Sequence, residues 1–249
     1  MEQPDAARAA ESHAYDRYVS THVLTRKPLP TNASIAARIP KLRALYGRYL
    51  PAAKSIPILD AGCGHGTLLH WLQTEGFAGA EGVDVSAEQI ELGRSLGIRN
   101  LYVGSLEDHL RDRPNTYGVI FMRDVLEHVP KKDVCSVLDL CARSLQPGGV
   151  LVVQVPNADS PFFGRIRYGD FTHQAAYNKS SLSQLFLLAG LGPFDFRPAI
   201  VLPLTIRTMR KWLSWKFFSI MYRAGLSAEL GPGDYIVSMN IVAAARKAV

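Results

Sequence analysis

The chain has 249 residues, 47% of them hydrophobic, which is enough to bury the core of one large α/β domain with additions. Its 28 Lys and Arg against 22 Asp and Glu give a formal net charge of +6, which is compatible with anionic partners but does not choose among phosphate, nucleic acid and membrane. Three cysteines without a C-x-x-C pair indicate neither a disulfide framework nor a zinc site. A polar start and the lack of a long uncharged apolar run argue against a signal peptide and a membrane span, so we expect a cytoplasmic protein.

Residues 1–55 are polar, with scattered aromatic residues and five prolines, and predict short helices and a linker. The pattern then changes to short apolar runs separated by segments of helical character, which is typical of βαβ units around a parallel sheet. The predicted strands are residues 56–60, 80–85, 100–103, 117–122 and 149–155, with a last strand in the stretch that starts at Tyr235.

Helix signals occur between these runs. Ser86 with Gln89, and Ser181 with Gln184, match the capping box of a helix start. A predicted helix over residues 133–145 carries one apolar stripe and is stopped by Pro147, Gly148 and Gly149. We therefore expect an α/β fold.

The segment ILDAGCGHG, residues 58–66, joins a strand to a helix through a glycine-rich turn. Glycines allow close approach of a ligand to the backbone, and the start of the helix offers unpaired N–H groups. Asp84 ends the next strand, where its carboxylate can accept hydrogen bonds from ribose hydroxyls. Thr67 stands where the nicotinamide fingerprint has its third glycine, so a nucleoside ligand is favoured over a dinucleotide.

These motifs, together with MRDVLEHVP at 122–130 and LQPGGVLVVQVPN at 145–157, resemble those of class I S-adenosylmethionine (SAM) dependent methyltransferases. The resemblance covers roughly residues 55–200. It implies SAM as cofactor and a doubly wound, mainly parallel, seven-stranded Rossmann-like sheet in a domain of residues 56–249. It also implies an amino-terminal helical lid within 1–55, where Tyr15, Tyr18 and His22 either cover the cofactor or simply pack, and a carboxyl-terminal insertion at about 200–232.

By the same resemblance, Asp60 and Gly62 lie near the methionine end of SAM, Asp84 holds the ribose, and residues 104–110 border the adenine. Many relatives place Asp directly after the glycine of that last turn, where this chain has Ser105. Ser105, Glu107 or Asp108, or backbone groups at Leu106, are alternatives for the adenine contact. The cofactor-binding candidates are Asp60, Gly62, Cys63, Gly64, Asp84, Val85, Ser105, Leu106 and Arg123.

Methyl transfer from a sulfonium needs mainly alignment, and a hydroxyl acceptor also needs a general base. Histidine has a suitable pKa, and His128 in LEHVP and His173 in YGDFTHQAAY both follow predicted strands. His128 is equally well interpreted as a structural histidine. We expect no metal, because no carboxylate cluster has the spacing of a divalent-cation site.

The stretch PFFGRIRYGDFTH, residues 161–173, is interpreted as a loop over the acceptor, with Arg165, Arg167, Tyr168 and Asp170 as substrate-binding candidates. Its guanidinium groups suit a phosphate or carboxylate, and an exposed basic loop is the alternative. The segment is similar to that of methyltransferases in glycan and polysaccharide biosynthesis, where an Asp-x-Thr-His element lies beside the acceptor.

Between Phe196 and Ala228 the chain has no acid, while cations alternate with aromatic residues. On a helix, Leu213, Phe217 and Ile220 share one side, with Lys216 and Arg223 near it. Three interpretations compete: an interfacial helix that brings the enzyme to a lipid-linked acceptor, an insertion packed on the core, and a nucleic-acid patch. The last is disfavoured because the aromatic residues are clustered rather than spread along a groove.

The predicted function is O-methylation of a sugar or lipid-linked glycan intermediate by a cytoplasmic enzyme, with peripheral membrane contact through the basic aromatic segment. One alternative is a methyltransferase that acts on a quinone precursor or another small natural product. A second alternative is a SAM-binding accessory protein of a membrane-associated assembly that no longer transfers methyl groups.

Overall fold

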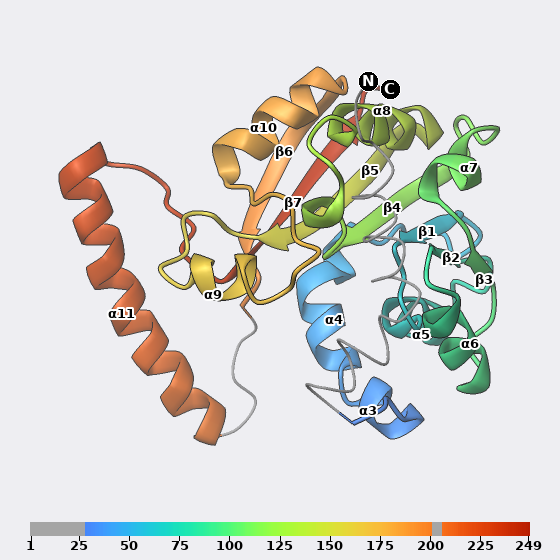
Figure 1. Ribbon diagram of the computed structural model, residues 1–249, viewed down its shortest axis with the longest axis horizontal. Coiled ribbons are helices and arrows are strands. Elements are labelled where there is room, and N and C mark those ends of the chain that lie inside the picture. Colours follow the sequence, from blue (N-terminus) through green and yellow to red (C-terminus); the bar gives the residue numbers. More distant parts are fainter. Residues whose placement is uncertain (1–27, 201–205) are drawn as a thin grey trace, which may run out of the picture.

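The structure, a computed structural model, describes residues 28–200 and 206–249. Its centre is one seven-stranded sheet in the order β3-β2-β1-β4-β5-β7-β6 (Figure 1). Strands β1 to β5 run parallel to one another, and β7 is antiparallel to β5 and β6. The predicted doubly wound, mainly parallel fold is therefore confirmed. The strands are β1 (Ile58–Ala61), β2 (Glu81–Asp84), β3 (Leu101–Val103), β4 (Tyr117–Arg123), β5 (Leu145–Pro156), β6 (Leu191–Pro198) and β7 (Asn240–Lys247).

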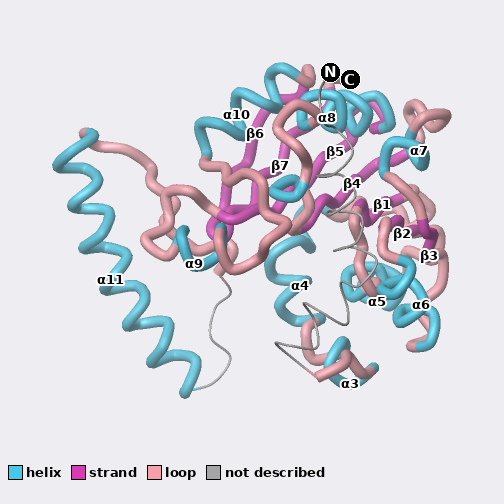
Figure 2. The backbone as a smooth tube through the Cα atoms, in the orientation of Figure 1, coloured by secondary structure: helices cyan, strands magenta, loops and turns pink. Residues whose placement is uncertain are grey.

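Helices cover both faces of the sheet (Figure 2). On one face α8 and α10 bury Leu138 and Phe186 in a core cluster with the sheet, and on the other face α4 and α5 bury Leu42 and Trp71 in a second cluster. The helices are α3 (Asn32–Ala36), α4 (Ile39–Tyr46), α5 (Thr67–Thr74), α6 (Ala87–Ser95), α7 (Leu106–Leu110), α8 (Val134–Ser144), α9 (Phe163–Arg167), α10 (Lys179–Leu188) and α11 (Ile206–Leu230), with 3-10 turns η2 (Gly47–Tyr49) and η3 (Leu126–His128).

Three strands differ clearly from the sequence prediction. Strand β5 begins at Leu145, before the Pro147-Gly149 stop, because the strand accommodates these residues at an irregularity in its pairing with β4. The sequence prediction contains no strand at β6, which carries two prolines; the structure places it at the edge of the sheet, where a missing N–H is tolerated. Strand β7 begins at Asn240, five residues after Tyr235.

One of the two predicted helix caps is correct. The Ser86 side chain accepts a hydrogen bond from the Gln89 backbone N–H at 3.4 Å. The other helix begins at Lys179, because Asn178, three residues before Ser181, is its N-cap and accepts from the Ser181 N–H at 3.0 Å. Ser181 completes this capping box by accepting from the Asn178 N–H at 3.0 Å.

The described part of the amino-terminal region forms α3, α4 and η2, as the short-helix prediction expected. Tyr46 of α4 packs edge-on against Phe121 of β4, and its hydroxyl donates to Oε1 of Gln154 at 2.6 Å. These helices therefore belong to the layer that covers the sheet. Tyr15, Tyr18 and His22, the candidates for a lid, lie outside the described residues.

Candidate active site

A cavity of about 390 Å³ opens at the carboxyl ends of β1, β2 and β4. This is the edge of a doubly wound sheet at which ligands bind, because the connections diverge there to opposite faces. Seven of the nine cofactor-binding candidates line the cavity: Gly62, Cys63, Gly64, Asp84, Val85, Leu106 and Arg123. Asp60 and Ser105 are not part of its wall.

The glycine-rich turn forms one wall because its backbone conformation requires glycine. Gly62 has φ +68°, and a Cβ added there would lie 2.3 Å from Cγ2 of Val125. The N–H groups of Gly62 and Cys63 both donate to the carbonyl of Val83, at 2.8 and 3.0 Å. These bonds fix the turn against β2, so the close approach of a ligand costs no rearrangement.

Asp84 and the turn form one hydrogen-bonded unit. Its carboxylate accepts from the Gly64 N–H at 2.7 Å and from the Ser86 N–H at 2.9 Å. Burial raises the pKa of Asp84, although both backbone hydrogen bonds favour its charged form. The result is a fixed acceptor in the cavity wall, which suits a ligand with vicinal hydroxyls.

Asp60 lies beneath this turn instead of lining the cavity. Its side chain is fully buried, and its Oδ2 has no hydrogen-bond partner among the described residues. Burial raises its pKa to about 7, against the opposing effect of the Arg123 guanidinium. Asp60 therefore does not contact a ligand in the cavity, and it can act on one only through its charge.

At the expected adenine side, the alternatives for Ser105 can now be separated. Ser105 is the N-cap of α7, where its Oγ accepts from the Asp108 N–H at 3.0 Å and donates to the Asp108 carboxylate at 2.8 Å. Ser105 and Asp108 are thus engaged with each other. Leu106 and Glu107 line the cavity, so they are the candidates that the geometry favours.

His128 also lines the cavity. The segment that contains His173 is hydrogen-bonded to the turn η3, which carries His128. The Glu127 carbonyl of that turn accepts from the N–H groups of Gln174 and Ala175 at 2.7 and 3.2 Å. The rings of His128 and His173 meet edge to face, with centroids 4.7 Å apart. The two histidines, separated by 45 positions in the sequence, therefore lie in one site.

A buried chain of hydrogen bonds orients His128. Thr172 Oγ1 donates to the carboxylate of Asp170 at 2.7 Å and lies 2.9 Å from Nδ1 of His128. Because that hydroxyl proton is directed to Asp170, the hydroxyl oxygen accepts from His128, whose proton is then on Nδ1 in the neutral ring. This tautomer places the lone pair on Nε2. Sequence analysis missed Thr172, although it is the threonine of the Asp-x-Thr-His element.

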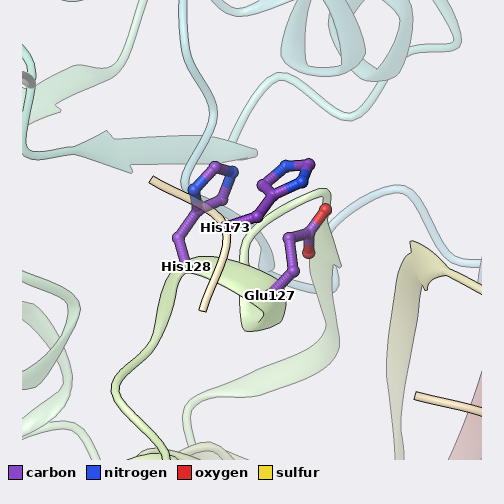
Figure 3. Close-up of side chains that lie close together, drawn as sticks. All are labelled: Glu127, His128 and His173. Carbon is purple, nitrogen blue, oxygen red and sulfur yellow. The ribbon is translucent and has the colours of Figure 1, made fainter. Parts of the chain in front are cut away.

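Glu127, His128 and His173 come together as a cluster (Figure 3). One potential ligand atom from each residue lies within 4.8 Å of the others. Burial raises the pKa of Glu127 well above its usual range, and its Oε2 has no hydrogen-bond partner among the described residues. Two imidazoles and a carboxylate can also hold a transition metal. The sequence predicted no metal because His173 lies 45 positions from His128, so the three residues meet only in the folded chain.

The substrate-binding candidates have different environments. Residues 163–167 form the short helix α9 within the predicted loop. Arg167 donates to the backbone carbonyls of His173 and Gln174, so its guanidinium braces the loop. His173 Nδ1 lies 3.0 Å from the Ile166 carbonyl and must donate to it, because a carbonyl cannot donate. Arg165 and Tyr168 are exposed, and Asp170 is buried in its bond to Thr172.

Asp124, which sequence analysis did not select, also lines the cavity. It has φ +56°, an unusual value for a residue other than glycine. Its Oδ1 accepts from Nε2 of Gln154 at 2.8 Å, and Gln154 in turn accepts from Tyr46. The available signal was its position as an acid two residues after the fourth predicted strand.

The fold and this site define a class I methyltransferase. Residues 35–192 match the family described as "Methyltransferase domain", so the chain belongs to that family. A SAM-dependent methyltransferase from Archaeoglobus fulgidus has the same fold, with a TM-score of 0.64 and 18% identity over 86% of this chain and 95% of that one. The predicted enzyme class and SAM as its cofactor are confirmed.

Two further comparisons differ in reach. A Burkholderia thailandensis 1,6-didemethyltoxoflavin-N1-methyltransferase, solved with S-adenosylhomocysteine, aligns over 100% of this chain and 94% of its own, with a TM-score of 0.59 and 16% identity. The ubiquinone biosynthesis O-methyltransferase of Vibrio cholerae is 38% identical over 97 residues, which are 37% of this chain and 38% of that protein. The chain thus matches well under half the length of its curated relatives. These relatives do not support the finer resemblance to glycan-pathway enzymes.

Proposed function

We propose that the protein transfers a methyl group from SAM to a phenolic oxygen of a quinone precursor. The main observation is the position of His128, which lies in the cavity wall with Nε2 as its basic atom because Thr172 and Asp170 orient the ring. The O-methyltransferase names of the curated relatives support this acceptor over the glycan that the sequence first favoured. The role of Arg167 as a brace also weakens the interpretation of the loop as an anion clamp.

The cavity residues divide the work of binding and orientation. SAM, when bound, supplies a methyl group on a positively charged sulfur. The rest of the cofactor is the leaving group, in which the sulfur is a neutral thioether. Asp84 accepts hydrogen bonds from the ribose hydroxyls, and the turn at Gly62–Gly64 lies against the amino-acid end. Leu106 and Glu107 border the base.

His128 performs the proton transfer in this proposal. As the acceptor oxygen bonds to the methyl carbon, the proton of the acceptor hydroxyl passes to Nε2 of His128. The resulting imidazolium still donates a hydrogen bond from Nδ1–H to Thr172 Oγ1. A phenol has a pKa near that of tyrosine, about 10, so a base close to neutral pKa suffices at physiological pH. Exposed Arg165 and Tyr168 are the candidates for contacts with the rest of the acceptor.

The test measures the transfer of label from methyl-labelled SAM to two acceptors, an alkyl catechol and a hexose glycoside. It compares purified wild type, His128→Asn and His173→Asn. We expect label on the catechol oxygen only, and about 10²–10⁴-fold slower transfer by His128→Asn with unchanged SAM affinity. Label on the glycoside alone would restore the glycan hypothesis. No label on either acceptor, with SAM still bound, would favour the accessory protein.

A chelator control separates a histidine base from a metal centre. Transfer by a histidine base persists after dialysis against a chelator. Loss of transfer that a divalent transition metal restores would instead assign Glu127, His128 and His173 as its ligands.

A further inference from the structure

Helix α11 has two apolar faces, one of which contacts the rest of the protein. The inner face is a stripe at helical spacing in which Ser219 is buried and the others are partly buried: Trp212, Trp215, Ser219, Tyr222 and Leu226. The ring of Phe162, just before α9, lies 6.1 Å from that of Trp215 and 5.8 Å from that of Phe218. The helix is therefore attached to the loop that leads to His173.

The outer face is apolar but uncovered. Leu213, Phe217 and Ile220, spaced by four and three residues, are 54%, 69% and 64% exposed. In Figure 1 α11 stands at the margin of the molecule, apart from the sheet. Contiguous exposed apolar residues of this kind mark an interaction site.

Cations border the outer stripe on both sides. With 3.6 residues per turn, Lys216 and Arg223 flank one edge and Arg210 flanks the other, and all three side chains are exposed. The only acid in α11 is Glu229, near its end. Lys216 and Arg223, which the sequence placed near the apolar side, thus border the stripe without dividing it.

We propose that the outer face of α11 binds the surface of an anionic lipid bilayer, with the helix axis in the plane of the membrane. Among the described residues, no helix is long and apolar enough to cross a bilayer. A helix about 37 Å long, with an apolar stripe that has cations on both sides, instead inserts its stripe among the acyl chains and leaves the cations at the anionic headgroups.

Charge disfavours a second copy of this chain as the occupant. A two-fold pairing of α11 through its outer face would bring the cations beside the stripe in one copy close to those of the other copy. Glu229 is the sole acid on each helix and cannot balance them. Anionic lipid, in contrast, neutralises all of these cations. The inference holds whatever acceptor the active site uses.

The binding test uses the full chain and sedimentation with vesicles of phosphatidylcholine, with and without phosphatidylglycerol. One triple variant replaces the apolar stripe (Leu213→Ser, Phe217→Ser, Ile220→Ser), and another replaces its cations (Arg210→Gln, Lys216→Gln, Arg223→Gln). Matched controls replace exposed leucines of α10 (Leu187→Ser, Leu188→Ser; 65% and 66% exposed) and exposed cations elsewhere (Arg99→Gln, Lys131→Gln, Lys132→Gln).

We expect wild type and both controls to bind the vesicles that contain phosphatidylglycerol and not those of phosphatidylcholine alone. Each α11 variant should bind the anionic vesicles at least about tenfold more weakly. High salt should weaken wild-type binding, since part of the attraction is between exposed charges. Unchanged melting temperatures would show that the variants fold. Equal binding by the α11 variants and their controls, or no binding by wild type, would overturn the proposal. So would a wild-type dimer that the apolar variant dissociates, because the face would then be occupied by a second copy.

Discussion

Thr172 has no reactivity of its own, yet the structure makes it the residue that orients the proposed base. Its hydroxyl is both a donor to Asp170 and the partner of His128 Nδ1, and it is buried. Fixing the tautomer of a histidine is worth much more to catalysis than the energy of one neutral hydrogen bond, because the wrong tautomer presents a proton where a lone pair is needed.

We therefore predict that Thr172→Val lowers kcat about tenfold or more while SAM affinity stays unchanged, whereas Thr172→Ser retains most of the activity. Valine has the shape of threonine without its hydroxyl, and serine keeps the hydroxyl. Single-turnover rates and calorimetric SAM binding measure the two effects. A larger loss in Thr172→Ser than in Thr172→Val would show that the methyl group, and hence packing, is what matters.

Asp60 leads to a prediction about stability and pH. Its pKa of about 7 in the folded protein, against 3.8 normally, means that the unfolded chain ionises first as pH rises. The contribution of Asp60 to stability is thus full below about pH 4 and is lost as pH rises to about 7.

In Asp60→Asn this titration is absent. The free energy of unfolding of the variant, minus that of wild type, should rise by roughly 2–3 kcal/mol between about pH 5 and pH 7.5, since one pKa unit corresponds to 1.36 kcal/mol. Urea unfolding at several pH values measures this difference. A constant difference across the range would mean that Asp60 does not titrate there.

At the scale of elements, the join of β1 to α5 defines the cofactor wall. Three glycines with positive φ, at 62, 64 and 66, bring the chain from the strand into the helix. Gly62 is the most crowded of the three: an added Cβ would lie 2.3 Å from Val125, against 3.4 Å from Gln89 at Gly64 and 3.1 Å from Ile98 at Gly66. The same turn therefore combines a local backbone requirement with a contact between distant parts of the chain.

Gly62→Ala should weaken SAM binding about tenfold or more and lower stability by about 1–2 kcal/mol, because its Cβ both strains the backbone and displaces Val125. Gly97→Ala is the matched control, since Gly97 also has positive φ but nothing lies within 4 Å of an added Cβ. It should show the stability loss alone. Calorimetry and thermal melting measure the two effects, and equal SAM affinity in both variants would contradict the prediction.

At the scale of the whole molecule, one polar network connects the layer of amino-terminal helices with the active site. Tyr46 of α4 donates to Gln154 of β5, and Gln154 donates to Asp124 in the cavity wall. The first of these bonds is buried beside the packed core. The helices before the sheet thus support the geometry of the site as well as the core.

Tyr46→Phe should cost about 1–3 kcal/mol of stability and weaken SAM binding, because the Gln154 oxygen loses a buried partner and Asp124 loses its fixed position. Tyr235→Phe removes a hydroxyl whose bond to Gly231 lies near the end of α11, and it should leave SAM binding unchanged. Denaturant unfolding and calorimetry distinguish the two variants. Wild-type SAM affinity in Tyr46→Phe would show that Asp124 is held independently.

The sequence by itself determined the features that depend on neighbouring residues. The glycine turn, the acid at the end of β2, the cap at Ser86 and the alternation of strands with helices are all local patterns, and they suffice for the fold class, the methyltransferase class and the cofactor. Even local signals left alternatives where two residues could serve, as with the cap at Asn178 in place of Ser181.

Only the tertiary structure decided which distant residues meet. Thr172 reaches His128 across 44 positions, Tyr46 reaches Gln154 across 108, and Phe162 meets Trp215 from a loop outside the helix. Such contacts follow from the packing of layers on the sheet, and neither periodicity nor turn composition encodes them. For the same reason the structure, and not the pattern of α11, revealed which of its two apolar faces is covered and which is exposed.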